Sequence, residues 1–188
     1  MEDEARRVRD GWIACRCQLG EPGAFDLLVA EMERPLLGYI IKLLGNEDAA
    51  LDVLQEVWMK VFRGIGALRA PEAVRTWLYR VARGTAPNRV RQDAARFRGE
   101  EPLGETPDEA FDATEAGMGF GQDQVLEVHR ALDRLEARHR EVLVLLFLEQ
   151  LTVDEIAAIV GVPPGTVKSR IHSAKKALRG LLEGSGNE

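Results

Sequence analysis

The sequence predicts an all-α protein, built from two small helical domains that a flexible acidic linker joins. Before residue 98 and again after residue 124, apolar residues recur at intervals of three and four, the spacing of one face of an α-helix. Residues 99–123 combine glycine, proline and acids without any such period. The chain is therefore expected to divide into a domain at 1–98, a linker at 99–123 and a domain at 124–188.

The first long helix is expected over residues 25–44. Pro35 should kink or divide it, because proline has no backbone N–H to donate. Gly45 and Asn46 form its stop. Its apolar face comprises Phe25, Leu28, Met32, Leu36, Tyr39, Ile40, Leu43 and Leu44.

A second amphipathic helix is expected over residues 50–62. Its polar residues Asp52, Gln55, Glu56 and Lys60 lie largely off the apolar face. That face comprises Ala50, Val53, Leu54, Val57, Trp58, Val61 and Phe62.

A loop with Gly64, Gly66 and Pro71 precedes a third helix that begins near Glu72. This helix should end or bend between Arg83 and Asn88, because a glycine and a proline follow, which cost about 1 and about 3 kcal/mol in a helix interior. A three- or four-helix bundle results. The third helix is expected to bury Val74, Trp77, Leu78 and Val81.

The second domain should contain a helix-turn-helix. REVLVLLFLEQL is apolar on nearly all sides and is expected to be its core helix. Thr152 and Glu155 have the spacing of a capping box, so a short helix should begin at about Val153. Gly161 ends that helix, and Pro164 is well placed as the first residue of the next. Two helices around a tight glycine turn are typical of proteins that insert the second helix into the major groove.

The second helix of this pair has an apolar stripe and an opposite basic face. Val167, Ile171, Ala174 and Leu178 should pack on the domain. Hydroxyl groups and cations on the other half suit phosphate oxygens and base edges, so this face is a candidate DNA contact rather than a merely solvated one. The candidate residues are Thr166, Lys168, Ser169, Arg170, His172, Ser173 and Lys176.

Charge is strongly segregated along the chain, although the formal net charge is -6. Residues 63–98 hold nine arginines against two carboxylates, giving +7, and residues 161–180 hold five cations and no acid, giving +5. Residues 99–127 hold nine acids and no cation. Two basic blocks around an acidic one suggest two contact surfaces for a polyanion, joined by a tether.

Several other classes of protein are disfavoured. No run of eighteen apolar residues exists, so we expect no membrane insertion and a cytoplasmic protein. Cys15 and Cys17 lack partners for a disulfide framework or a zinc site, and neither a metal nor another cofactor is expected. No phosphate-binding loop, HExxH or nucleophile motif is present, so the protein should not be an enzyme and should have no small-molecule substrate.

These stretches resemble the extracytoplasmic-function (ECF) sigma factors of bacterial RNA polymerase. The opening of their region two is similar to AFDLLVAEMERPLLGYIIKLLG, their polymerase-binding stretch to DVLQEVWMKVF, and their promoter-melting helix to RTWLYRVAR. Their region four is similar to residues 131–182, especially in EIA, the Gly161 turn and GTVKSR. The resemblance covers about residues 25–98 and 125–182.

The resemblance implies a non-catalytic subunit that binds core RNA polymerase, melts the minus-ten promoter element and reads the minus-thirty-five element. It assigns the polymerase contact to Asp52, Gln55, Glu56 and Lys60, and the minus-thirty-five contact to the candidate residues of the second helix. Region two would supply the minus-ten contact, although Trp77 fits the core better than base stacking. The resemblance also implies an anti-sigma factor as a further partner. The minus-ten residues would be Arg69, Arg75, Thr76, Trp77, Arg80 and Arg83.

A helix-turn-helix regulator that binds DNA without polymerase is the main alternative. Such a protein would usually need a dimer to match a palindromic site. The first half distinguishes the two hypotheses, because it resembles a polymerase-binding region rather than a ligand-binding or phosphoacceptor domain.

Overall fold

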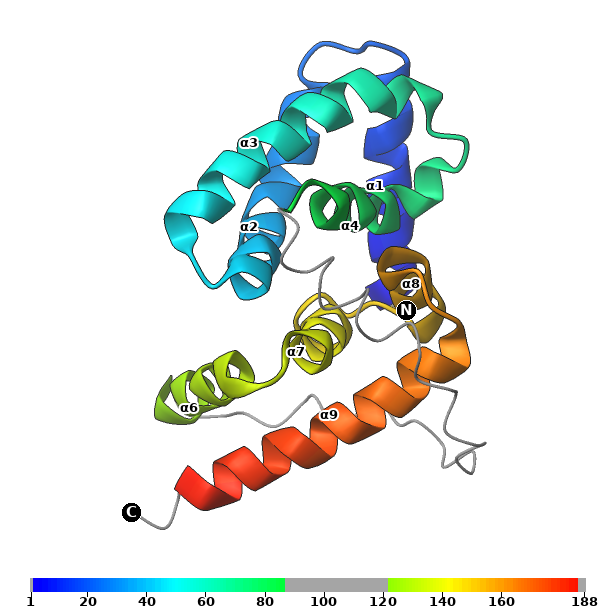
Figure 1. Ribbon diagram of the computed structural model, residues 1–188. Coiled ribbons are helices and arrows are strands. Elements are labelled where there is room, and N and C mark those ends of the chain that lie inside the picture. Colours follow the sequence, from blue (N-terminus) through cyan, green and yellow to red (C-terminus); the bar gives the residue numbers. More distant parts are fainter. Residues whose placement is uncertain (1, 87–121, 186–188) are drawn as a thin grey trace. The chain divides into compact units, whose positions relative to one another are not determined.

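The computed structural model describes residues 2–86 and 122–185, and the two parts are considered separately (Figure 1). Every regular element within these two ranges is helical, which confirms the all-α prediction. The linker expected at 99–123 falls outside the described residues except for Gln122 and Asp123, which are helical.

The first part is a bundle of four α-helices, in agreement with the expected three or four. Two short 3₁₀ turns stand between the third and fourth helices. The elements are α1 (Glu2–Gln18), α2 (Ala24–Leu44), α3 (Glu47–Gly64), η1 (Ile65–Ala67), η2 (Pro71–Ala73) and α4 (Val74–Thr85).

The predicted stop after α2 is confirmed. Gly45 has a left-handed backbone (φ 67°), and its N–H donates to the carbonyl of Ile41 at 2.8 Å. Asn46 caps α3, because its side-chain oxygen accepts from the backbone N–H of Ala49 at 2.9 Å. α4 ends at Thr85, inside the window expected from the glycine and proline that follow Arg83.

Pro35 does not divide the helix that was expected over residues 25–44, because α2 continues through Pro35 to Leu44. A proline in a helix interior costs about 3 kcal/mol. Met32 and Leu36, three residues before and one residue after Pro35, are almost completely buried, and their packing offsets that cost. Tertiary burial thus overrides the local signal.

The core of this part lies between α2, α3 and α4. Tyr39 of α2 and Tyr79 of α4 are both about 1% exposed or less and meet edge to face, with ring centroids 5.1 Å apart. The expected core position Phe62 is wrong, because this side chain is 68% exposed, although its ring meets that of Phe25 in a T-shaped pair with centroids 5.2 Å apart. Trp77 and Val81 are half-buried rather than buried.

Within residues 122–185 the second part consists of four α-helices and one π-helical turn. Its elements are α6 (Gln122–Arg134), α7 (Ala137–Leu143), a π-helical turn η4 (Val144–Leu148), α8 (Val153–Val160) and α9 (Pro164–Ser185). α9 packs on both α6 and α7.

The core helix expected from REVLVLLFLEQL is present over residues 140–148, but from Val144 onward it is π-helical. α7 ends at Leu143, and in the following turn the N–H of Glu149 bonds to the carbonyl of Val144, five residues back. The wider turn leaves Leu148 46% exposed, while Leu143 and Leu145 stay buried. A segment apolar on all sides has no sequence period that would indicate this change.

Candidate nucleic-acid interface

The predicted capping box at the start of α8 is present. The N–H of Thr152 donates to a carboxylate oxygen of Glu155 at 2.8 Å, and the Thr152 hydroxyl oxygen accepts from the N–H of Glu155 at 3.4 Å. At the other end of α8, Gly161 is left-handed (φ 73°) and its N–H bonds to the carbonyl of Ala157 at 2.9 Å. α9 begins at Pro164 as predicted. The helix-turn-helix is therefore fixed at both ends of its short helix.

The two predicted faces of α9 are confirmed in the main. Val167, Ile171 and Ala174 are at most 1% exposed, whereas the fourth residue of the stripe, Leu178, is half-buried. On the other half of the helix the side chains of Lys168, His172, Ser173, Lys176 and Arg179 are exposed.

Three further candidates lie at the edge of this basic face. Thr166, Ser169 and Arg170 are half-buried, and the Ser169 hydroxyl donates to the carbonyl of Thr166 at 3.0 Å. Lys175, which was not a candidate, lies over the Phe147 ring at 5.2 Å. The structure thus brings all seven candidates to one side of one helix and turns Lys175 toward the π-helical turn.

The candidates of the first part are less uniform. Arg69 in the loop and Arg80 on α4 are exposed, and Thr76 and Arg83 are half-buried. Trp77 packs against the end of α3: a Cβ added to Gly64 would lie 3.1 Å from a ring carbon of Trp77. That contact agrees with the preference for a core role over base stacking.

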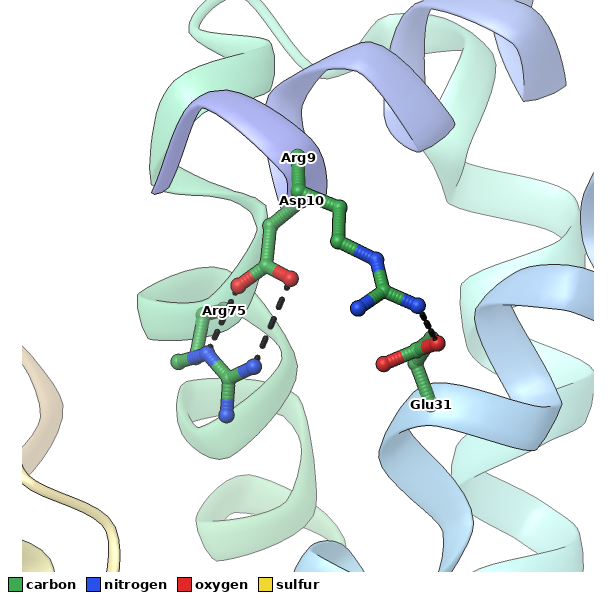
Figure 2. Close-up of polar contacts among 4 residues, drawn as sticks. All are labelled: Arg9, Asp10, Glu31 and Arg75. Atoms are coloured by element: carbon green, nitrogen blue, oxygen red, sulfur yellow. Dashed lines mark hydrogen bonds and ion pairs between the residues drawn. The ribbon is translucent and has the colours of Figure 1, made fainter. Parts of the chain in front are cut away.

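The expectation that Arg75 faces DNA does not fit its surroundings. Its Nε donates to a carboxylate oxygen of Asp10 at 2.7 Å, and its Nη2 is 3.4 Å from the other oxygen. The side chains of Arg75 and Asp10 are only 14% and 6% exposed. Figure 2 shows this pair beside a second one, in which Arg9 reaches Glu31 on α2. Arg75 is thus held by a nearly buried carboxylate.

The candidate polymerase face on α3 is exposed. Asp52, Gln55, Glu56 and Lys60 share one side of the helix, on which Lys60 pairs with Glu56 at 2.8 Å. Lys60 also donates to the Thr85 hydroxyl at 3.0 Å and so joins α3 to the end of α4.

Exposed apolar side chains lie beside this face. Leu51 and Met59 are 48% and 49% exposed. Their exposure has no sequence signal beyond their places off the apolar stripe.

Within residues 2–86 and 122–185 no group of three His, Cys, Asp or Glu side chains could hold a metal ion, and no helix there is long and apolar enough to cross a membrane. Burial raises the pKa of the Cys17 thiol, an effect that the charge of Arg16 partly opposes.

Two family models match this chain. Residues 28–96 match Sigma-70 region 2, and residues 126–178 match Sigma-70 region 4. The RNA polymerase sigma-H factor of Pseudomonas aeruginosa is 33% identical, with 93% of this chain and 94% of the relative covered. The chain belongs to the ECF RNA polymerase sigma factors.

Other relatives of this sigma factor are of similar length. The ECF RNA polymerase sigma-E factor of Haemophilus influenzae is 28% identical, with 95% of this chain and 98% of the relative covered. That of Escherichia coli strain K12 is 29% identical, with coverage of 93% and 94%.

Two solved structures share the fold. CnrH, solved in complex with the cytosolic domain of CnrY, matches with a TM-score of 0.66 and 23% identity over 93% of this chain and 97% of that one. The sigma factor RpoE from Bartonella quintana, solved in complex with the anti-sigma factor NepR, matches with a TM-score of 0.64 and 23% identity over 86% and 98%.

Proposed function

We propose that this sigma factor binds core RNA polymerase in the cytoplasm and directs promoter-specific initiation, by melting the minus-ten element and reading the minus-thirty-five element. The observation that carries the proposal is the α9 face, where exposed cations and hydroxyl groups stand opposite a buried stripe behind a capped glycine turn. In helix-turn-helix proteins the start of the second helix enters the major groove.

The minus-thirty-five contact is assigned to the basic face of α9. Lys168 and Lys176 lie two turns apart, so they suit phosphates that flank the groove. His172 and Ser173 stand between them and suit base edges or phosphates. Thr166, Ser169 and Arg170 complete the face at its edge.

The minus-ten contact is assigned to the loop before α4 and to α4 itself. Exposed Arg69 and Arg80 are the strongest phosphate contacts, and Thr76 and Arg83 lie closer to the core. Arg75 and Trp77 act through packing, in keeping with the Asp10 pair and the Gly64 contact.

The polymerase contact is assigned to the exposed side of α3. Asp52, Gln55 and Glu56 lie there at helical spacings of three and four, beside apolar Leu51 and Met59. Charged groups around exposed apolar side chains are the composition of a transient protein interface. Lys60 shares this side and also supports α4.

Two further features follow from the family assignment. Residues 99–123 serve as an acidic tether between the two DNA-binding domains, 1–98 and 124–188. An anti-sigma factor is a proposed partner, supported by the solved structure of the sigma factor RpoE in complex with the anti-sigma factor NepR. The protein needs no cofactor or small-molecule substrate for this activity.

Run-off transcription with purified bacterial core polymerase tests the proposal. The template is a library of promoter fragments, and wild type is compared with a Lys168→Gln, Lys176→Gln double variant. Lys175→Gln is the control on the same helix, because it removes one positive charge, against two in the double variant, on the side that contacts Phe147. We expect transcripts that require the protein, a strong loss in the double variant and little change in the control.

Salt dependence separates a DNA contact from a folding defect. Each phosphate contact contributes a slope of about -0.9 to log K against log salt, so loss of two contacts should reduce the slope of DNA binding by about 2. If the protein neither binds core polymerase nor supports initiation, yet binds duplex DNA alone, the polymerase-independent regulator replaces this proposal.

A further inference from the structure

The N-terminal helix α1 contacts the loop between α3 and α4 along most of that loop. Figure 1 shows α1 beside this segment, and α1 meets η1, η2 and α4 in turn. Among residues 65–73 only Ile65 is buried, so the loop has little core packing of its own. Contacts with neighbouring elements must therefore fix the conformation of the loop.

Gln18, the last residue of α1, binds both ends of the η1 turn. Its side-chain amide nitrogen donates to the carbonyl of Ile65 at 3.1 Å and to the carbonyl of Leu68 at 2.7 Å. Each of the two amide hydrogens is used. The next residue along the loop is exposed Arg69, so the backbone is held immediately before the proposed DNA contact.

Gly11 allows α1 to touch the backbone of η2. A Cβ at this position would lie 3.1 Å from the Cα and 3.3 Å from the nitrogen of Glu72. Such separations are shorter than ordinary van der Waals contact. Only glycine permits this approach without displacement of the loop.

Asp10 completes the series through its ion pair with Arg75 at the start of α4. From Gln18 back to Asp10, α1 therefore contacts successive points of the chain from Ile65 to Arg75. On its other side α1 is joined to α2 by the Arg9 pair with Glu31 (Figure 2). The helix is thus connected to the bundle core as well as to the loop.

We infer that α1 positions the loop between α3 and α4 (residues 65–73), to which the proposed function assigns the minus-ten contact. Gln18, Gly11 and Asp10 are positioning residues that fix the loop backbone, so that the loop presents Arg69 to the unwound promoter strand. This inference rests on the proposed function of the loop. It assigns a role in promoter selectivity to residues that do not themselves touch DNA.

The first experiment measures how strongly α1 restrains the backbone of the loop. Gln18→Leu keeps a side chain of similar size but removes both donors, and Leu19→Ala changes the neighbouring side chain, which is 77% exposed. Hydrogen exchange on the full chain should show amides of residues 65–75 exchanging about tenfold faster in Gln18→Leu, with amides of α2 unchanged. Equal loop exchange in all three proteins would overturn the inference.

The second experiment measures selectivity. Run-off transcription by holoenzyme uses two promoter libraries, one randomised at the minus-ten element and one at the minus-thirty-five element. In Gln18→Leu the preference among minus-ten sequences should fall by about fivefold, as expected for the loss of one or two hydrogen bonds, while the minus-thirty-five preference stays unchanged. A less stable protein would instead lower all transcripts equally.

The outcomes separate this inference from the proposed function. Wild-type transcription with an unchanged minus-ten preference in Gln18→Leu would overturn the inference alone. Absence of any wild-type transcript would overturn the proposed function and the inference with it. If Gln18→Leu does not fold, Gly11→Ala perturbs the same loop from η2 and carries the same expectations.

Discussion

Replacing Gly11 by alanine tests whether α1 and η2 meet as closely as described. In a helix interior, alanine is more favourable than glycine by about 0.5–1 kcal/mol. At position 11, however, the added Cβ would lie 3.1 Å from the backbone of Glu72. Forcing one carbon into a packed contact typically costs about 1–3 kcal/mol. The packing cost outweighs the propensity gain at most of these values, so Gly11→Ala should destabilise the first part of the chain by up to about 2.5 kcal/mol.

Gly38→Ala is the matched control. Gly38 lies in the middle of α2, its side is exposed, and a Cβ there would meet nothing within 4 Å. The same chemical change should therefore stabilise by about 0.5–1 kcal/mol. The propensity gain is common to both variants, so they should differ by the packing cost at position 11 alone, about 1–3 kcal/mol.

Urea denaturation followed by tryptophan fluorescence is the assay. All three tryptophans, Trp12, Trp58 and Trp77, lie in the first part, so emission reports its unfolding within the full chain. At a typical slope of about 1–2 kcal/mol per molar urea, the two midpoints should differ by an amount on the order of 1 M. If Gly11→Ala raises the midpoint as Gly38→Ala does, the close approach of α1 to η2 is wrong.

Three further substitutions or reactions test individual contacts. Asp10→Asn removes one charge of a nearly buried ion pair and should lower the free energy of unfolding by about 3 kcal/mol. Arg9→Gln changes a side chain that is 63% exposed and should lower it by less than about 1 kcal/mol in the same urea assay. Equal losses in the two variants would contradict the burial of the Asp10–Arg75 pair. Thr152→Ala removes the capping-box hydroxyl and should lower the free energy of unfolding of the second part by about 1 kcal/mol, as measured by calorimetry. An unchanged free energy of unfolding would contradict the stabilising role of the cap. Iodoacetamide should modify exposed Cys15 before Cys17. Because burial raises the pKa of Cys17, the alkylation rate of Cys17 should keep rising at pH values above the ordinary thiol pKa. Peptide mass spectrometry measures both rates, and unfolding in urea should make the two rates equal.

The helix-turn-helix could be predicted from the sequence almost completely, because its signals are local. The capping box, the Gly161 turn, the start at Pro164 and the buried stripe of α9 each depend on residues at most a few turns apart. The family assignment depends on motifs in the same chain order and is equally a property of the sequence.

Long-range pairings were decided by the tertiary structure alone. Asp10 and Arg75 are 65 residues apart, and Gln18 and Leu68 are 50 apart, and neither pair has any periodic signal. The same holds for the change from α-helix to π-helix at η4 and for the continuation of α2 through Pro35. Spacing within a helix determines which residues share a face, but only packing determines what that face meets. That is why the sequence alone predicted the α9 surface, whereas the roles of Arg75 and of the whole of α1 emerged from the fold.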